Sequence, residues 1–212
     1  MGLIISLCGV DGSGKTTIAK YLFKKMQGGH QNIKYRHEID LFLLKSLLAL
    51  TEKLFGRTNS DNLKEVVLSS TEQGKFFFSD AYYFLFWLDN LLMYISIKLK
   101  NEIVIHDRWV YDITTVFEHK KYRNKFIKFL LLNFPKSDLL FLLDVPSKVA
   151  YKRKMNTLGH ENHSIKYYQE MSKSISNVIQ IKGCDAIINS NKNKDEVVNE
   201  ILKIISKKIK LN

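Results

Sequence analysis

The chain has 212 residues, 45% of them hydrophobic, and only two prolines. This length and composition fit one helix-rich globular domain and exclude a disordered chain, because enough apolar surface is present to form a core. The formal net charge is +12, carried mostly by lysines spread along the chain. No zinc-finger spacing or RNA-recognition motif accompanies this charge, so no nucleic acid is expected as a partner.

The first residues and the cysteines bear on the cellular compartment. Residues 1–8 contain no basic stretch ahead of their apolar run, so we expect no cleaved signal peptide. Cys8 and Cys184 each border an apolar, strand-like run, which is typical of small buried thiols in a reducing compartment. A cytoplasmic location is therefore expected.

Short apolar runs alternate with helical patterns, which predicts a parallel sheet with helices on both faces. Strands are predicted over residues 3–8, 33–37, 102–106, 139–144 and 185–189. Helices are predicted over residues 15–27, 40–55, 76–100, 121–133, 146–156, 165–181 and 193–209. The predicted fold class is α/β with a five-stranded parallel sheet, and no linker is long enough to divide the chain.

The most informative motif follows the first predicted strand. Residues 9–16 read GVDGSGKT, the phosphate-binding pattern G-x-x-x-x-G-K-[ST], between a strand-like and a helix-like segment. Glycines let backbone N–H groups turn toward phosphate oxygens, and the helix N-terminus adds the positive end of its dipole. We expect Lys15 to contact the outer phosphates and Thr16 to bind Mg²⁺. The residues expected to bind the nucleotide are Gly9, Gly12, Ser13, Gly14, Lys15, Thr16 and Thr17.

A long apolar segment needs a separate interpretation. Residues 76–97 resemble a membrane span in length and apolarity, but Asp80, Asp89 and Asn90 interrupt them. Because charges are costly inside lipid, we expect a buried helix beside the ligand cleft and no transmembrane span. Together with the apolar residues 41–50, this segment could form a hydrophobic dimer face or a contact with a membrane surface.

A second motif ends the third predicted strand. Residues 103–109 read IVIHDRW, which puts an acid and an arginine at the carboxyl end of a buried strand, where open α/β sheets bind ligands. Asp107 is expected to orient Mg²⁺ and its waters, and Arg108 suits the phosphate of an acceptor. A surface ion pair at a strand end is the alternative interpretation.

These motifs together resemble the thymidylate kinase family, a branch of the nucleoside monophosphate kinases. The loop over residues 9–17 resembles the family's phosphate loop, including its internal Asp-Gly, and residues 107–109 resemble its Asp-Arg-aromatic motif. Residues 143–146, with Ala150 and Arg153, are similar to the strand and helix that precede the lid. Residues 188–190, followed by Glu196 and Val197, are similar to the loop on the adenine side.

The resemblance implies a fold and an activity. The fold would be that of a phosphate-loop nucleoside monophosphate kinase, with an acceptor-side helical region around 38–100 and a short lid around 153–164. ATP with Mg²⁺ would be the phosphoryl donor, and a nucleoside monophosphate, with dTMP as first candidate, would be the acceptor. No general base is needed, because a phosphate monoester is already an anion near neutral pH. A homodimer would also be expected.

The family's residue roles carry over by position. Lys15 would hold the donor phosphates, Arg108 the acceptor phosphate, and Arg153 would enter from the lid, so these three are the expected catalytic residues. Thr16 and Asp107 would hold the metal ion.

The residues expected to bind the acceptor also carry over by position. Arg108 belongs both to this group and to the expected catalytic residues. Asp11 would approach the acceptor sugar, and Phe86 would stack on the acceptor base. The arginine that helps to read thymine in the family is replaced here by Asn90, whose amide can still hydrogen-bond a base. Glu161 and Tyr167 keep the family's acid-to-aromatic spacing after the lid.

Other functions remain open on the residues alone. A kinase for a small hydroxyl acceptor would need a carboxylate base, for which Asp107 or Asp11 could serve. A GTPase would need a guanine-reading Asn-Lys-x-Asp, but residues 191–194 end in lysine. A nucleotide-binding protein without catalysis is a third possibility. A metal site formed by His160 and His163 with Glu161 is not expected, because no fourth ligand is evident.

Overall fold

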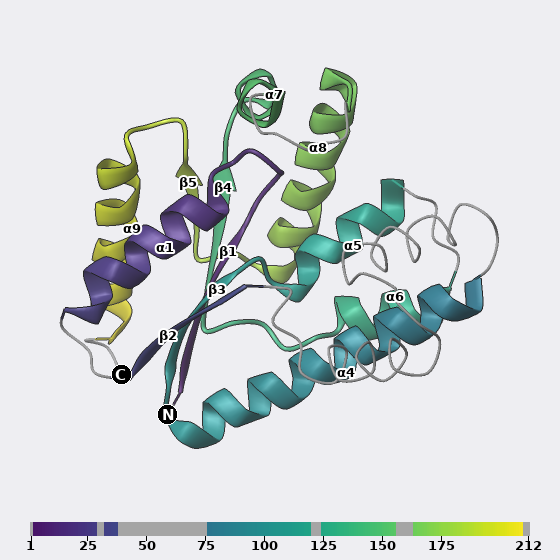
Figure 1. Ribbon diagram of the computed structural model, residues 1–212, viewed down its shortest axis with the longest axis horizontal. Helices are drawn as coiled ribbons and strands as arrows, with labels where there is room; N and C mark the ends of the chain where they lie inside the picture. The colour runs from purple at the N-terminus through teal and green to yellow at the C-terminus, as the bar shows by residue number, and fades with distance from the viewer. Residues whose placement is uncertain (1, 29–31, 38–75, 120–123, 156–162, 210–212) are drawn as a thin grey trace, which may run out of the picture.

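The structure is a computed structural model that describes residues 2–28, 32–37, 76–119, 124–155 and 163–209 (Figure 1). Five strands form one sheet in the order β2-β3-β1-β4-β5, and each pair of neighbours is parallel. The strands are β1 (Leu3–Cys8), β2 (Ile33–His37), β3 (Ile103–Asp107), β4 (Leu139–Asp144) and β5 (Ala186–Asn189). The predicted α/β class and parallel sheet are confirmed, and the observed β3 begins and ends one residue later than the predicted strand 102–106, so that it includes Asp107.

Helices cover both faces of this sheet (Figure 1). One face carries α1 (Lys15–Gln27) and α9 (Lys194–Ile209). Helices on the other side are α4 (Phe76–Lys100), α5 (Val110–His119), α6 (Lys125–Leu132) and α8 (Ile165–Lys182), whereas α7 (Ser147–Met155) lies beyond the carboxyl end of β4, at the top of the view. The helix predicted over 40–55 lies outside the described residues. Within the described ranges, no helix is long and apolar enough to cross a membrane.

Helix α5 was not predicted from the sequence. Its residues 113–116 read ITTV, four β-branched side chains that disfavour an isolated helix. In the fold, the hydroxyls of Thr114 and Thr115 donate back to the carbonyls of Tyr111 and Asp112, each at 2.7 Å. Val110 and Tyr111 are almost fully buried. Tertiary packing therefore outweighs local propensity in this segment.

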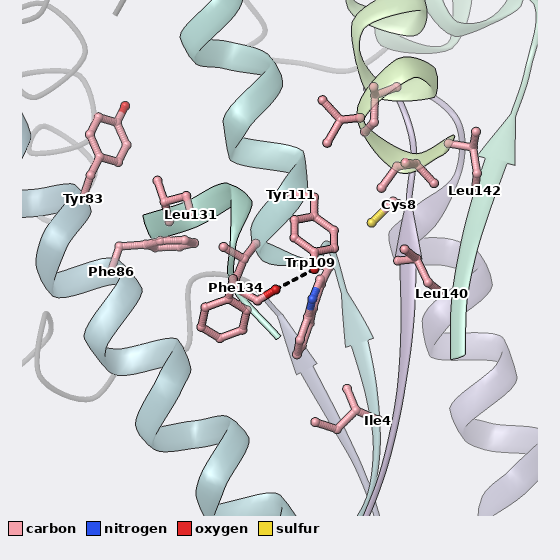
Figure 2. Close-up of a cluster of buried hydrophobic side chains, with 14 of the residues drawn as sticks. Ile4, Cys8, Tyr83, Phe86, Trp109, Tyr111, Leu131, Phe134, Leu140 and Leu142 are labelled. Atoms are coloured by element: carbon pink, nitrogen blue, oxygen red, sulfur yellow. Dashed lines mark hydrogen bonds between the residues drawn. The ribbon is translucent and has the colours of Figure 1, made fainter. Parts of the chain in front are cut away.

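The two faces of the sheet have separate cores because side chains alternate along each strand. Ile5 and Leu7 of β1 pack on the face covered by α1 and α9. Ile4 and Cys8 point to the opposite face, where an aromatic cluster that includes Trp109 fills the space between the sheet and α4, α5, α6 and α8 (Figure 2). Both faces of the central strand are thus buried, which fixes the position of the loop that leaves its carboxyl end.

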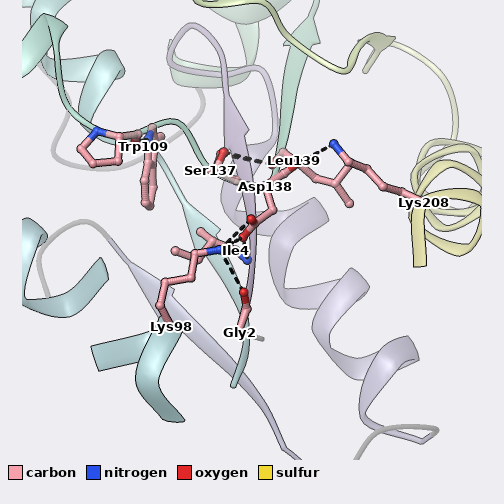
Figure 3. A network of polar contacts seen from close by, with 10 residues as sticks. Gly2, Ile4, Lys98, Trp109, Ser137, Asp138, Leu139 and Lys208 are labelled. Atoms are coloured by element: carbon pink, nitrogen blue, oxygen red, sulfur yellow. Dashed lines mark hydrogen bonds and ion pairs between the residues drawn. The ribbon is translucent and has the colours of Figure 1, made fainter. Parts of the chain in front are cut away.

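A polar network ties the amino ends of the strands together (Figure 3). The Asp138 carboxylate accepts hydrogen bonds from the Ile4 backbone N–H at 2.7 Å and from the Lys98 ammonium at 2.6 Å. Lys208 of α9 donates to the Asp138 carbonyl at 2.7 Å and to the Asp185 carboxylate at 2.8 Å. This network lies at the end of the sheet opposite the phosphate loop, so it stabilises the fold at a distance from the candidate site.

Candidate functional site

The loop between β1 and α1 has the backbone shape of a phosphate cradle. Gly12 and Gly14 adopt φ of +83° and +89°, in the left-handed region that side chains rarely enter. A Cβ on Gly12 would lie 2.4 Å from the Ala150 carbonyl oxygen, so α7 packs directly against this part of the loop. A Cβ on Gly9 would lie 2.6 Å from the Leu143 carbonyl oxygen. Glycine is therefore required for both the turn and the packing.

Lys15 lies inside this loop and is 3% exposed. Its ammonium donates to the carbonyls of Gly9 at 2.5 Å and Val10 at 2.9 Å. Burial lowers the pKa of Lys15, and the neighbouring Arg108 lowers it further. Nearby carboxylates raise the pKa and so oppose this shift. The ammonium is therefore stabilised both by hydrogen bonds to carbonyls of the loop and by the surrounding negative charge.

The other loop residues differ in exposure. Ser13 is fully buried, and its hydroxyl has no hydrogen-bond partner among the described residues. Thr16, in the first turn of α1, is half-buried, whereas Thr17 is exposed. Thr16 is thus partly enclosed beside Lys15, whereas Thr17 faces solvent.

Asp107 ends β3 directly beside the carboxyl end of β1, where it pairs with Leu7. It is fully buried, and one carboxylate oxygen accepts a hydrogen bond from the Tyr35 hydroxyl at 3.0 Å, with His37 at 3.6 Å. The other oxygen, Oδ1, has no hydrogen-bond partner among the described residues. Such an oxygen costs free energy unless a ligand or water satisfies it. A carboxylate oxygen of this kind is a hard ligand that suits Mg²⁺, so the chemistry of Asp107 fits the predicted metal role, which stays a prediction for both Asp107 and Thr16.

Arg108 has a strained backbone and a close ionic partner. Its φ of +73° is unusual for a residue with a side chain and costs about 1–2 kcal/mol. Its guanidinium donates to the Asp11 carboxylate at 2.5 Å, and Asp11 also lies 3.8 Å from the Lys15 ammonium. Burial opposes the charge of Asp11, but Arg108 and Lys15 outweigh it and hold the pKa of that carboxyl well below its usual range.

Arg153 projects from the last turn of α7 and spans two loops. Its guanidinium donates to the Gly12 carbonyl and to the Ser190 carbonyl, each at 3.3 Å. It therefore lies over the phosphate loop and reaches the segment that follows β5. A cavity of about 440 Å³ opens beside that segment. Its polar lining residues are Asp144, Ser147, Ser172, Asn189 and Asn191.

Phe86 and Asn90 lie one turn apart on α4, and each is 2% exposed. The Asn90 amide donates to the Phe86 carbonyl at 2.7 Å, within its own helix. The ring of Phe86 packs among buried residues that include Tyr83 and Leu131 (Figure 2). Their proposed part in base recognition stays a prediction, since both side chains are covered in this structure. Glu161 lies outside the described residues.

Two charged residues of the site were not predicted from the sequence. Lys154 follows Arg153 on α7, and burial, opposed by Asp11, lowers its pKa. Asp112, in the first turn of α5, is 6% exposed and acts electrostatically on Lys15. Asp112 follows the end of β3 by only five residues, which places it close to the site in the sequence. Its position in the first turn of a helix could not be predicted, because helix α5 itself was not predicted.

Comparisons with known proteins agree with this geometry. Residues 7–201 match the family described as Thymidylate kinase. The chain is 25% identical to the probable thymidylate kinase 1 of Saccharolobus solfataricus, with 99% of this chain and 100% of the relative covered. It is 28% identical to the probable thymidylate kinase of Sulfolobus acidocaldarius, with 95% of each covered. It is 26% identical to the thymidylate kinase of Mycoplasma capricolum, with 99% and 97% covered.

Family membership follows from the extent of these matches together with the site that the sheet assembles. The family match covers both the phosphate loop from Leu7 onward and the loop after β5 that Arg153 reaches. The chain belongs to the thymidylate kinase family and is an enzyme of the nucleoside monophosphate kinase class.

Proposed function

We propose that the protein transfers the γ-phosphoryl group of ATP to the phosphate of dTMP, yielding ADP and dTDP. An oxygen of the acceptor phosphate forms a bond to the γ-phosphorus, and the bond from that phosphorus to the β–γ bridging oxygen breaks. The electron pair leaves with ADP, and no proton has to be removed from the acceptor, since a phosphate monoester is ionised near neutral pH.

One observation carries this proposal. The Asp11 carboxylate lies between two cations, 2.5 Å from the Arg108 guanidinium and 3.8 Å from the Lys15 ammonium. Lys15 belongs to the loop that would bind the donor phosphates, and Arg108 follows the end of the neighbouring strand. A donor and an acceptor phosphate held by these two groups would meet at the carboxyl edge of the sheet. Charge neutralisation and alignment are the main contributions that phosphoryl transfer needs from a protein.

The remaining site residues support this reaction. Arg153 already bridges the phosphate loop and the segment after β5, so it would bind donor phosphates without a large movement of α7. Thr16 and Asp107 would hold Mg²⁺, which when bound would neutralise charge on the donor phosphates. Asp11 would orient Arg108 and accept a hydrogen bond from the acceptor sugar.

A coupled assay of ADP release across dTMP, dUMP, UMP, CMP, AMP and GMP tests the acceptor. We expect the highest kcat/KM with dTMP. Arg108→Ala and Lys15→Ala should each lower the rate by about 10²–10⁴-fold, as removal of positioning and charge-stabilising groups does. Lys24→Ala, at an exposed position of α1, is the matched control and should leave the rate unchanged. Turnover of deoxynucleosides without turnover of any monophosphate would instead favour a hydroxyl acceptor.

We also propose a homodimer formed through α4. Four large apolar side chains on this helix, spaced along one face, are 41–78% exposed. They are Phe84, Leu92, Ile95 and Leu99. Light scattering after size exclusion should give a dimer for the wild type and a monomer for Ile95→Lys. Ile187→Lys, at an exposed site on the edge strand β5, should remain dimeric. A monomeric wild type would contradict this assembly.

The organisation of the chain is likewise a proposal. Residues 1–212 would act as one kinase domain, with the acceptor side around 38–100 and the lid around 153–164. Much of both regions lies outside the described residues. The cytoplasm is the proposed location, supported by two free cysteines, of which Cys8 is fully buried.

A further inference from the structure

The chain turns sharply between β3 and α5, and Arg108 lies at this turn. Its φ of +73° is in the left-handed region, which residues with a side chain rarely adopt. Such a conformation persists only where the surrounding structure holds it, and it occurs most often at functional sites. The contacts that hold the backbone of Arg108 therefore decide where its guanidinium lies.

Both backbone polar groups of Arg108 have defined partners. Its N–H donates to the Leu7 carbonyl at 3.1 Å, which continues the pairing of β3 with β1. Its carbonyl oxygen lies 2.6 Å from Nδ1 of His106, two residues earlier in the chain. Because a carbonyl oxygen can only accept a hydrogen bond, Nδ1 of His106 carries the hydrogen and donates it. Strand pairing thus fixes one side of the turn, and the His106 side chain fixes the other.

His106 is itself held by the core and is 2% exposed. The planes of its ring and of the Trp109 ring are at 89°, with the ring centroids 5.2 Å apart. Trp109 belongs to the aromatic cluster (Figure 2), is fully buried, and donates from Nε1 to the Pro135 carbonyl at 3.2 Å. The imidazole therefore has little freedom to move, so it can hold the Arg108 carbonyl in one place.

The direction of the Arg108 side chain depends on this turn. With the observed backbone, the guanidinium reaches the Asp11 carboxylate at 2.5 Å, while the side chain remains 28% exposed. A return of φ to the usual negative region would rotate the Cα–Cβ bond of Arg108 and carry the guanidinium away from Asp11. This guanidinium is the group to which the acceptor phosphate is assigned above.

We propose that His106 is a positioning residue for the acceptor, whose Nδ1–H holds the Arg108 carbonyl and so keeps the Arg108 guanidinium at the acceptor phosphate. His106 is buried and acts through Arg108, without touching either nucleotide. The inference rests on the acceptor role proposed for Arg108, and it does not depend on which base the acceptor carries.

Two substitutions separate the hydrogen bond from the packing of the ring. His106→Asn keeps a nitrogen donor bonded to Cγ, as Nδ1 is, but removes the ring. His106→Phe keeps a ring against Trp109 but removes the donor. In the Phe variant we expect calorimetric affinity for dTMP, and kcat/KM for dTMP with it, to fall by about tenfold, the equivalent of about 1.4 kcal/mol. Its MgADP affinity should be unchanged, and the Asn variant should stay close to the wild type in both.

A double-mutant cycle tests whether His106 acts through Arg108. In an Arg108→Ala background, His106→Phe should not lower kcat/KM for dTMP further, because the group that it positions is already absent. Tyr111→Phe is the matched control, since it removes another side-chain donor to a backbone carbonyl in the same aromatic cluster, the 2.7 Å hydrogen bond to Phe134. It should lower the melting temperature without changing the affinity for dTMP.

Wild-type affinity for dTMP in a folded His106→Phe protein would overturn the proposal. An equal loss in the Asn variant, or additive losses in the cycle, would overturn it as well. If His106→Phe does not fold, His106→Leu takes its place. Failure of both variants to fold would also overturn the proposal, because the role of His106 would then be structural.

The crystal structure of the Phe variant separates this inference from the acceptor assignment. We expect φ of Arg108 to leave the left-handed region and its guanidinium to leave Asp11, whatever the acceptor is. This change in a protein that turns over no monophosphate would contradict the proposed reaction and support the action of His106 on Arg108. Turnover of dTMP with Arg108 unmoved would do the reverse.

Discussion

Replacement of Gly12 by alanine would test the contact between the phosphate loop and α7. Gly12 has φ of +83°, and a Cβ there would lie 2.4 Å from the Ala150 carbonyl oxygen and 3.0 Å from two other backbone atoms of that residue. No side-chain rotation can relieve this overlap, because the opposing atoms belong to the helix backbone. The loop or α7 would have to move.

Two contributions set the size of the effect. A side chain in the left-handed region costs about 1–2 kcal/mol, and overpacking against a rigid neighbour costs about 1–3 kcal/mol. The expected loss of unfolding free energy is therefore about 3 kcal/mol, or roughly 6–12 °C in melting temperature for a chain of this size.

The same displacement should weaken nucleotide binding. Arg153 donates to the Gly12 carbonyl at 3.3 Å from α7, so movement of this helix would draw the guanidinium off the loop. We expect MgADP affinity to fall by at least about tenfold, the equivalent of about 1.4 kcal/mol. Thermal unfolding by circular dichroism and calorimetric titration with MgADP measure the two effects separately.

Two other glycines provide matched controls. Gly183 has φ of +72°, and a Cβ there would have no atom within 4 Å, so Gly183→Ala should show the conformational cost alone and unchanged binding. Gly28 has a helical φ of −67°, and the nearest atom to a Cβ there would be at an ordinary 3.9 Å, so Gly28→Ala should be close to neutral. Equal melting temperatures for Gly12→Ala and Gly183→Ala, with equal MgADP affinity, would refute the reasoning.

Three further predictions concern the metal, the network at the amino ends of the strands, and acid stability. Asp107→Asn should raise the Mg²⁺ concentration needed for half-maximal turnover, and chelation of Mg²⁺ should abolish turnover of the wild type; an unchanged Mg²⁺ requirement would contradict the metal role. Asp138→Ala should cost about 1–3 kcal/mol of stability, because it leaves the Ile4 N–H without its acceptor and Lys98 with only the Gly2 carbonyl, while kcat measured well below the melting temperature stays the same. Burial opposes the charge of Asp185, but the hydrogen bond from Lys208 and its other partners prevail and lower its pKa in the folded state. Its stabilising effect is therefore present above the ordinary carboxyl pKa of about 4 and is lost as the pH falls below that value. Asp185→Asn should flatten this acid decline in urea unfolding curves, and an equally steep decline would contradict the assignment.

Local sequence determined the first strand, the loop and the first helix. The residues that form them are consecutive, and the glycines at 12 and 14 stand where the backbone needs a left-handed turn. Most of the remaining predicted elements were also found, because their apolar periodicity is set by burial on one or both sides of a sheet. Helix α5 was missed, because its β-branched residues disfavour a helix until packing against Cys8 and its neighbours stabilises it.

The tertiary structure decided which charges meet. Asp11 and Arg108 are 97 positions apart, and they come within 2.5 Å because β1 and β3 lie side by side and end at the same edge of the sheet. Arg153 reaches Ser190 for the same reason, through the ends of β4 and β5. The burial of Lys15 and Asp107 is likewise a property of the packed fold, and the interaction between two charges depends on the medium that surrounds them. The sequence by itself determined the chemical groups available for phosphate binding, and only the packing of the sheet and helices decided how strongly they act on one another.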